Sequence, residues 1–228
     1  MRLQLIERRE ETQGVETYIF KPQEELSWKP GQFLHYVLHH RPTDERGSDR
    51  WFTVASSPSE GHVQLTTRFT HDAGSTFKKA LAALKAGEIV EIADVDGDFT
   101  VDDPSREMIF IAGGIGITPF RAILKEADTK GVKLNVTLIY GSRDTNIVFK
   151  DELESFAKKN PGIKIHYLIS PEKIDEASVR KLVPDLTKPV FYVSGPEPMV
   201  ESLNATLKSM GVPQEHLKGD WFPGYEAE

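Results

Sequence analysis

The chain has 228 residues, 39% of them hydrophobic, which suits one large or two small globular domains with packed cores. The formal net charge of -7 and the pI near 5.6 argue against nucleic acid as a partner. Cysteine is absent, which excludes disulfides, iron–sulfur clusters, thiolate zinc sites and a cysteine nucleophile from this polypeptide. The first ten residues lack the apolar core of a signal peptide, and no apolar stretch approaches membrane-spanning length, so a cytoplasmic protein without a membrane span is expected.

Residues 1–103 are predicted to form an antiparallel β-barrel domain. Short segments rich in β-branched and aromatic residues alternate there with turn signals, at a spacing typical of small barrels. One helix is expected at residues 75–85, because Phe77, Leu81 and Leu84 share one helical face. The six expected strands cover residues 3–6, 15–20, 33–38, 51–55, 63–69 and 88–92.

Residues 104–228 are predicted to form an α/β domain of the Rossmann type, followed by a C-terminal tail. Apolar runs of strand length alternate with helical periodicity, which implies a parallel sheet covered by helices and a ligand site at the carboxyl ends of its strands. The expected strands cover residues 108–112, 134–139, 163–169 and 190–193, and the expected helices cover residues 119–127, 150–158, 175–182 and 197–210.

A glycine turn follows the first of these strands. Gly113, Gly114 and Gly116 allow a sharp turn and a close approach by a ligand, while Thr118 and Pro119 have the residue types of an N-cap and a first helical residue. The free N–H groups at such a helix start attract anions, so the turn is predicted to bind the phosphates of a dinucleotide. The alternative is a tight connection with no ligand.

Two further strand ends point toward the same crevice. Ser142 and Arg143, with Lys150 downstream, suit a 2′-phosphate better than a ribose hydroxyl, which favours NADPH over NADH. Arg143 could equally be a solvated residue on the approach to a helix. The run Ser194-Gly195-Pro196, with Met199 four residues after Gly195, follows the fourth strand.

The first half contains phosphate-type features of its own. On a strand, Arg50 and Phe52 would share one face while Thr53 points to the other, so that they can serve different parts of an extended ligand. Ser75 and Thr76 begin the expected helix and could bind a second pyrophosphate. Taken singly, these motifs are also explained by a hydroxyl cap and an exposed arginine on a barrel strand.

In this order the motifs resemble the ferredoxin–NADP reductase superfamily, whose members join an FAD-binding antiparallel barrel to a nicotinamide-binding α/β domain. The resemblance implies that Arg50 contacts the flavin pyrophosphate, Phe52 packs near the isoalloxazine and Thr53 hydrogen-bonds near flavin N5. It makes Thr53 and Ser194 the expected catalytic residues, with Ser194 beside the nicotinamide. The cofactor-binding residues that it implies are Arg50, Trp51, Phe52, Thr53, Thr67, Gly74, Ser75, Thr76, Gly113, Gly114, Gly116, Thr118, Pro119, Ser142, Arg143, Gly195, Pro196, Met199, Phe222 and Tyr225.

The chain departs from the family pattern at two of these positions. Phe52 stands where the family usually has tyrosine, which loses a phenolic hydrogen bond and keeps the ring packing. Ser194 stands where the family often has cysteine, which keeps a hydrogen-bonding group and loses a polarisable sulfur. Trp221, Phe222 or Tyr225 could cover the isoalloxazine; alternatively Trp221 and Phe222 finish the last strand and pack in the core. No histidine spacing suggests a metal site, and none is expected.

The resemblance implies an FAD-dependent NAD(P)H oxidoreductase that transfers a hydride between nicotinamide C4 and flavin N5 and exchanges electrons with ferredoxin, flavodoxin or a small acceptor. One alternative is the reductase component of an oxygenase or another multicomponent system. A third hypothesis, of another class, is a non-catalytic flavin- or nucleotide-binding electron-transfer or regulatory subunit.

Overall fold

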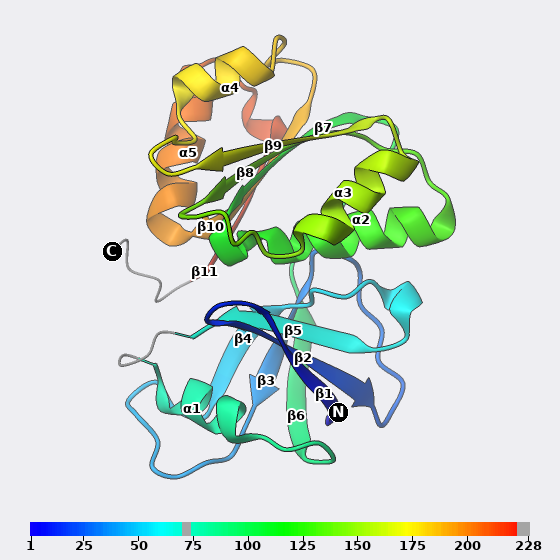
Figure 1. Cartoon of the computed structure of the whole chain (residues 1–228), viewed down its shortest axis with the longest axis vertical. Helices are drawn as coiled ribbons and strands as arrows, with labels where there is room; N and C mark the ends of the chain where they lie inside the picture. The colour runs from blue at the N-terminus through cyan, green and yellow to red at the C-terminus, as the bar shows by residue number, and fades with distance from the viewer. Residues whose placement is uncertain (70–73, 223–228) are drawn as a thin grey trace.

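The structure is a computed structural model that describes residues 1–69 and 74–222, apart from the side chain of Phe222, and it contains two β-sheets that lie one above the other (Figure 1). The strands are β1 (Arg2–Thr12), β2 (Val15–Pro22), β3 (Phe33–Val37), β4 (Asp49–Thr53), β5 (Val63–Arg68), β6 (Ile89–Asp96), β7 (Glu107–Gly113), β8 (Asn135–Ser142), β9 (Ile163–Ile169), β10 (Val190–Pro196) and β11 (Leu217–Phe222). The α-helices are α1 (Thr76–Ala83), α2 (Thr118–Lys130), α3 (Lys150–Lys159), α4 (Glu176–Leu182) and α5 (Glu197–Ser209), and the 3-10 helices are η1 (Pro58–Glu60), η2 (Gly114–Ile117) and η3 (Gln214–His216).

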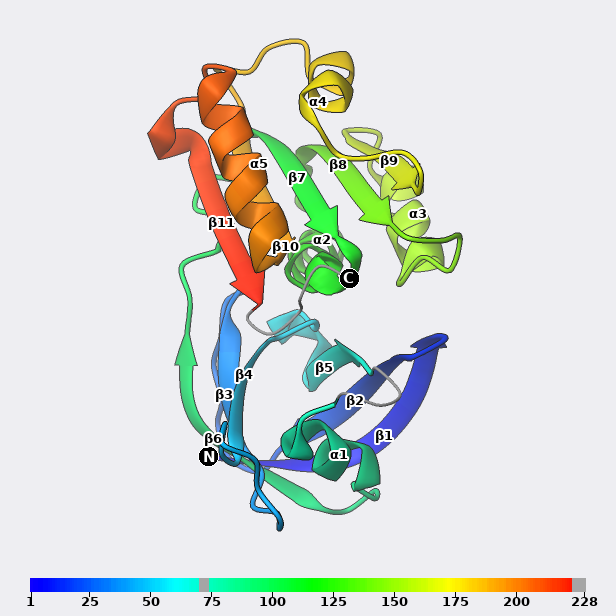
Figure 2. The same cartoon turned by 90° about the vertical axis from the view of Figure 1, so that its left-hand side faces the viewer.

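The first sheet is antiparallel in the order β4-β3-β6-β1-β2-β5, and it bends into a barrel-like shape (Figure 2). Its two end strands meet just beyond β4, where the backbone N–H of Ala55 donates to the carbonyl of Gln64 over 2.8 Å. Helix α1 places Phe77 and Leu81 in the core of this sheet, beside rings such as Tyr36. The expected barrel half and its single helix are therefore confirmed, with α1 shorter than the predicted range 75–85.

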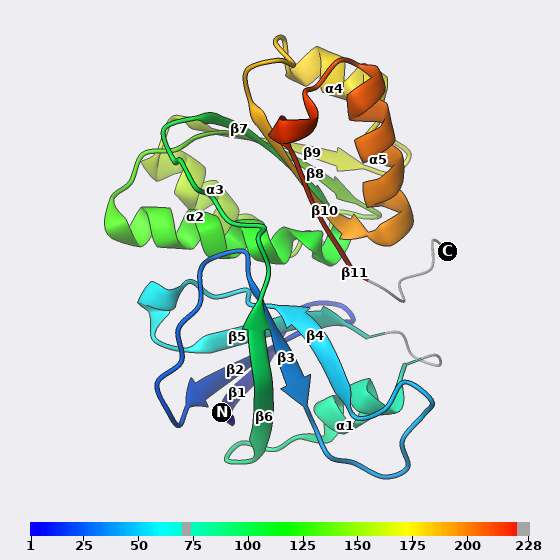
Figure 3. The same ribbon diagram turned by 180° about the vertical axis from the view of Figure 1, so that it is seen from behind.

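The second sheet is parallel in the order β11-β10-β7-β8-β9. Along β7, Met108 and Phe110 pack with residues of α2 and α3, whereas Ile109 and Ile111 pack with residues of α4 and α5. Figure 3 shows these two helix pairs on opposite faces of the sheet. Because both faces of a central parallel strand are buried, β7 is a continuous apolar run with no polar alternation. The predicted α/β half is confirmed.

The last strand settles one alternative left open for the C-terminus. β11 pairs with β10 in parallel, so Trp221 belongs to the last strand, but its side chain is 49% exposed and does not pack in the core. Phe222 ends this strand, and nothing is described of its side chain. Tyr225 lies outside the described residues, so its predicted contact with the flavin stays a prediction.

The connection from β6 to β7 contains the predicted domain boundary at 103/104, which stays a prediction. The ring of Phe99 in this connection lies 5.4 Å from that of Tyr192 and 5.6 Å from that of Phe120, both in the second half. Lys218 of β11 donates to the carbonyl of Thr100 over 2.8 Å. The connection is therefore anchored to the parallel sheet. Among the described residues, no helix is both long and apolar enough to cross a membrane.

Candidate functional site

The glycine turn follows β7 as the sequence predicts and forms the 3-10 helix η2, which continues directly into α2. Gly114 adopts a left-handed backbone with φ of 52°, and a Cβ atom built there would meet nothing within 4 Å. A left-handed position facing open space suits glycine and leaves the backbone accessible. Gly114 is therefore the point of this turn that a phosphate group could approach.

The other glycines of the strand ends pack closely against the chain itself. A Cβ atom on Gly116 would lie 2.2 Å from the carbonyl oxygen of Ser194, on neighbouring β10. Cβ atoms on Gly113 and Gly195 would collide with the Met199 side chain of α5, the first of them with its sulfur. These glycines thus allow the turn to pack against β10 and α5. The sequence analysis assigned all of them to ligand binding and did not predict this packing role.

The predicted N-cap role of Thr118 is wrong. Thr118 is the first residue of α2, has helical backbone angles and is preceded by Ile117 at the N-cap position. Its buried hydroxyl donates to the carbonyl of Ile115 over 3.1 Å, so it bonds back into η2. The cause is the 3-10 turn, which continues into α2 and leaves no extended residue to act as a cap. Pro119 is buried within the first turn of α2.

The carboxyl ends of β7 and β10 lie side by side. Ala112 pairs with Ser194, and Ser194 pairs in turn with Asp220 of β11, while Gly113 pairs with Gly141 of β8. Ser142 follows Gly141 and so lies one position beyond the residue that pairs with Gly113. The exposed Arg143 comes next. The fold brings the three predicted strand ends to one edge of the sheet, with Pro196 at the N-cap of α5.

Asp220 is a further residue of this edge that the sequence analysis missed. Its side chain is 9% exposed, and its Oδ2 atom accepts a hydrogen bond from the hydroxyl of the fully buried Ser194 over 3.4 Å. Burial, with a smaller contribution from the charge of Asp98, raises the pKa of Asp220 to about 7. In the sequence, the only sign of this residue's role was that it is a single carboxylate within the C-terminal run of aromatics. Its burial depends on β11 pairing with β10.

The stability of the protein should depend on pH through Asp220. Because its folded pKa lies above the ordinary 3.8, the folded state binds this proton more tightly than the unfolded chain, and stability is lost as pH rises from about 4 to 7. Asp220→Asn should reduce the stability that is lost between pH 5 and pH 8 by on the order of 2 kcal/mol. Urea unfolding of both proteins at pH 5 and pH 8 measures it. Equal pH-dependent changes in the two proteins would contradict the assignment.

The predicted flavin side lies on β4, where the alternation of faces is as expected. The Arg50 guanidinium lies 5.6 Å from the ring centroid of Phe77, and Phe52 packs 5.8 Å from that ring, so both face α1. Trp51 lies on the outer face, 44% exposed and stacked on His35 at 4.3 Å. Phe52 therefore packs against the barrel core, as a ring without a hydroxyl can.

Asp44 joins two of the predicted phosphate-binding features. Its carboxylate accepts the backbone N–H of Thr76 over 2.8 Å at the start of α1, and it lies 3.4 Å from the guanidinium of Arg50. The hydrogen bond from Thr76 is the main reason that the pKa of Asp44 lies below its ordinary value. Ser75 is the N-cap and accepts from the backbone N–H of Lys78 over 3.2 Å. The Asp44 carboxylate thus lies between the guanidinium of Arg50 and the start of α1. An anionic group at this position matches the chemistry of a pyrophosphate site.

Thr53 ends β4 and is 4% exposed, and its hydroxyl has no hydrogen-bond partner among the described residues. A buried hydroxyl without a partner is costly and calls for an explanation, such as a bound group. Thr67 is buried on neighbouring β5 and makes an interaction of its own, and Gly74 precedes the N-cap of α1. Among the described residues, no cluster of three metal-ligating side chains occurs.

Known proteins resemble this chain in sequence. Residues 110–205 match the family of oxidoreductase NAD-binding domains. The ferredoxin reductase component of 3-ketosteroid-9-alpha-monooxygenase from Mycolicibacterium smegmatis is 28% identical over all of this chain and 67% of its own length. A flavohemoprotein from Rhodopirellula baltica is 25% identical over 93% of this chain and 58% of its own length. The chain thus spans about three fifths to two thirds of these relatives.

Solved structures share the whole fold. A ferredoxin-NADP+ reductase from Plasmodium falciparum superposes with a TM-score of 0.82 at 18% identity, covering 97% of this chain and 95% of its own. A flavohemoglobin from Malassezia yamatoensis with bound FAD and heme gives 0.80 at 20% identity, covering 97% and 59%. These structures share the fold of this chain, an antiparallel barrel followed by a parallel α/β domain, as the motif order predicted.

Proposed function

We propose that the chain is an FAD-dependent NAD(P)H oxidoreductase, with FAD held by the barrel half and the nicotinamide nucleotide by the α/β half. The observation that carries this proposal is the buried hydroxyl of Thr53 at the end of β4, which has no hydrogen-bond partner within residues 1–69 and 74–222. β5, the neighbouring end of the barrel, packs against the η2 turn in which Gly114 leaves the backbone open. A hydroxyl that finds no partner in the described part of the chain and an open phosphate-type turn therefore lie at the junction of the two halves.

The described residues fit both FAD and a nicotinamide nucleotide. Arg50 and the start of α1 would hold the flavin pyrophosphate in place of Asp44, and Thr53 would hydrogen-bond to the flavin ring. The N–H groups of η2 at Gly114 would hold the nucleotide phosphates. When bound, FAD supplies the chemistry by accepting a hydride from the nicotinamide and passing electrons on. The protein aligns the two rings and excludes water from between them.

Ser194 and Asp220 would act at the nicotinamide end. The Ser194 hydroxyl is fixed by its bond to Asp220, so it presents its oxygen in one orientation at the end of β10. Asp220, with its raised pKa, is partly protonated near neutral pH and can hold a proton in this buried position without a net charge. The two side chains would orient the bound nicotinamide ring.

The choice of nucleotide is predicted to depend on Arg143, which follows Ser142 at the exposed end of β8. A guanidinium pairs well with a 2′-phosphate and has no equivalent partner on a ribose hydroxyl. Arg143→Ala should therefore raise the KM for NADPH about tenfold and leave the KM for NADH within about twofold. Steady-state kinetics with each nucleotide measure this difference. Equal changes in both KM values would contradict the role.

The electron acceptor is proposed to be a separate redox protein. The chain has no cysteine, so it carries no thiolate-bound cluster of its own. Two classes of acceptor follow, a ferredoxin or flavodoxin and an oxygenase component. The second is favoured by two relatives that are named as parts of oxygenases, the ferredoxin reductase component of 3-ketosteroid-9-alpha-monooxygenase and the electron transfer component of toluate 1,2-dioxygenase. Reduction of purified ferredoxin, flavodoxin and Rieske-type oxygenase proteins by the FAD-loaded chain and NAD(P)H separates these classes. A failure with every acceptor despite a reduced flavin would overturn the proposal of a protein acceptor.

A non-catalytic subunit is the remaining hypothesis. Such a subunit binds flavin or a nucleotide without catalysis, and its flavin-binding form requires that the bound flavin stays oxidised with either nucleotide. Incubation with FAD, removal of free flavin and a visible spectrum test whether the chain binds flavin. The expected result for the oxidoreductase is close to one FAD per chain. A protein that stays colourless would overturn both flavin-based hypotheses.

A further inference from the structure

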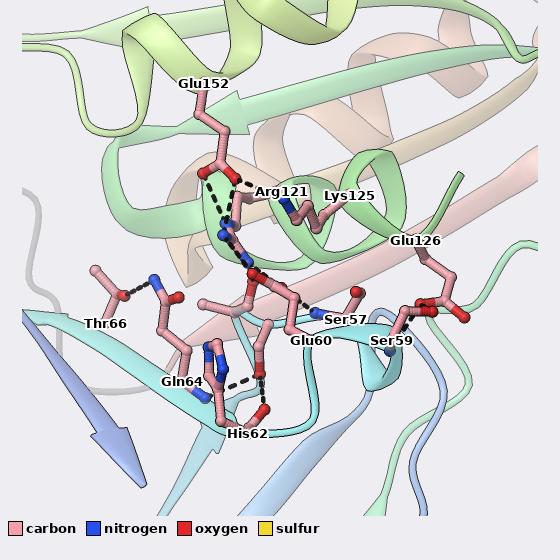
Figure 4. Close-up of polar contacts among 12 residues, drawn as sticks. Ser57, Ser59, Glu60, His62, Gln64, Thr66, Arg121, Lys125, Glu126 and Glu152 are labelled. Carbon is pink, nitrogen blue, oxygen red and sulfur yellow. Dashed lines mark hydrogen bonds and ion pairs between the residues drawn. The ribbon is translucent and has the colours of Figure 1, made fainter. Parts of the chain in front are cut away.

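A buried arginine joins the two halves of the molecule. Arg121 lies on α2, the helix that continues from the η2 turn, and its side chain is 4% exposed. All five of its N–H groups are used, and Figure 4 shows the carboxylates of Glu60 and Glu152 on opposite sides of the guanidinium. Such a fork with two paired carboxylates holds its partners in a fixed geometry.

The partners come from both halves. Glu60, in η1 of the barrel half, accepts from Nη1 over 2.5 Å and from Nη2 over 2.9 Å, and the Ala55 carbonyl accepts from Nη1 over 3.0 Å. Glu152, in α3 of the same half as Arg121, accepts from Nε over 2.9 Å and from Nη2 over 2.8 Å. One guanidinium therefore has a bidentate partner within its own half and another across the junction.

The positions of these groups in the chain connect the two candidate cofactor sites. Ala55 lies two residues after Thr53, and its N–H also joins the two ends of the barrel sheet. Arg121 lies seven residues after Gly114, on the helix that begins at the nucleotide turn. Burial would by itself raise the pKa of Glu60, but its hydrogen bonds and charge interaction with Arg121 hold that pKa below the ordinary value, so the pair stays ionised.

We propose that Arg121 is a positioning residue that sets the distance and orientation between the flavin site of β4 and the nucleotide site of η2. This inference rests on the proposed function for its effect on hydride transfer, but not for its effect on the arrangement of the two halves. A small error in the placement of two reacting rings is enough to slow transfer by tenfold or more. An ion pair that only stabilised the fold would leave that placement unchanged.

Two matched variants separate these roles. Glu60→Gln and Glu152→Gln each replace one bidentate carboxylate of the same guanidinium by a neutral amide of the same shape. Only Glu60→Gln weakens the link between the halves. Because the chain has no native cysteine, spin labels can be attached at Lys79→Cys on α1 and Glu201→Cys on α5, both exposed positions, without competing thiols.

Pulsed electron–electron distance measurement on the flavin-free, labelled chain gives a readout that needs no activity. We expect one narrow distance distribution in the parent and in Glu152→Gln, and a broadened or displaced distribution in Glu60→Gln. In the FAD-loaded proteins, stopped-flow reduction by NADPH should be about tenfold slower in Glu60→Gln, with FAD and NADPH affinities within twofold of the parent. Glu152→Gln should stay within twofold of the parent in rate.

Equal behaviour of the two variants in distance and in rate would overturn the proposal and leave Arg121 as a stabilising ion pair. A parent chain whose flavin is reduced by neither nucleotide would overturn the proposed function instead, while the distance measurement would still decide the positioning role. Arg121→Met, which removes every bond of the fork, should broaden the distances further. If that variant does not fold, the two glutamine variants still give the answer.

Discussion

Gly116→Ala is expected to lower the free energy of unfolding by about 3 kcal/mol and to remove most of the NAD(P)H-dependent flavin reduction. The added Cβ atom would lie 2.2 Å from the carbonyl oxygen of Ser194 and 2.7 Å from the backbone nitrogen of Gly195. Both contacts are with backbone, so no side chain can move aside, and η2 must separate from β10. Thermal unfolding should show a melting temperature lower by roughly 6–12 °C.

Gly114→Ala should have the opposite profile. Its Cβ atom meets nothing within 4 Å, so the cost in stability is only the strain of a left-handed alanine, about 1 kcal/mol. The methyl group would instead stand where the nucleotide phosphate approaches, and nucleotide affinity should fall at least tenfold. Gly131→Ala is the matched control, because Gly131 is also left-handed with φ of 67° and faces open space at the far end of α2.

These three variants are compared by thermal unfolding and by nucleotide titration. Gly131→Ala should show the small stability cost of Gly114→Ala with unchanged nucleotide affinity. A Gly116→Ala protein with the parent melting temperature would contradict the close packing of η2 on β10. A Gly114→Ala protein with the parent nucleotide affinity would contradict the phosphate site.

Thr53→Val is expected to slow flavin reduction by about tenfold to a hundredfold while leaving the flavin-free protein as stable as the parent or more stable. Valine keeps the shape of threonine and removes a buried hydroxyl that has no partner in the described structure, so the fold loses no hydrogen bond. The rate falls because the hydroxyl is the group proposed to contact the flavin ring. Stopped-flow reduction and urea unfolding of the flavin-free chain measure the two effects separately.

Thr66→Val is the matched control for this change. Thr66 is buried on β5, the other end strand of the barrel sheet, and its hydroxyl is paired with that of Thr17 at 2.7 Å. Its removal should lower stability by about 1 kcal/mol and leave the rate of flavin reduction unchanged. If Thr53→Val destabilised the flavin-free chain as much as Thr66→Val and left the rate unchanged, the Thr53 hydroxyl would be a structural group.

The sequence predicted those features that depend on local pattern. The continuous apolar run of β7 indicated a strand buried on both faces, and the alternation along β4 correctly grouped Arg50 with Phe52. Glycine, serine and arginine at three strand ends correctly predicted one shared edge, because parallel strands end on the same side of a sheet. The candidate roles of these residues toward cofactors remain proposals.

The features that the sequence did not predict depend on contacts between distant segments. The burial of Asp220 requires β11 to pair with β10, and the Arg121 fork requires η1 of one half to meet α2 and α3 of the other. Gly116 and Ser194, which pack against each other, are likewise 78 residues apart in the chain. Local periodicity does not encode such a contact. The cap assigned to Thr118 was wrong because a 3-10 turn, indistinguishable by residue type from a tight turn, precedes the helix.

We propose that this chain binds FAD in one half, binds NAD(P)H in the other and passes a hydride between them. An anaerobic titration of the FAD-loaded protein with NADPH, and separately with NADH, followed by the flavin absorbance near 450 nm, tests it most directly. We expect the flavin band to bleach with about one equivalent of nucleotide, and at lower concentrations of NADPH than of NADH. A bound flavin that keeps its oxidised spectrum with both nucleotides would overturn the proposed hydride transfer.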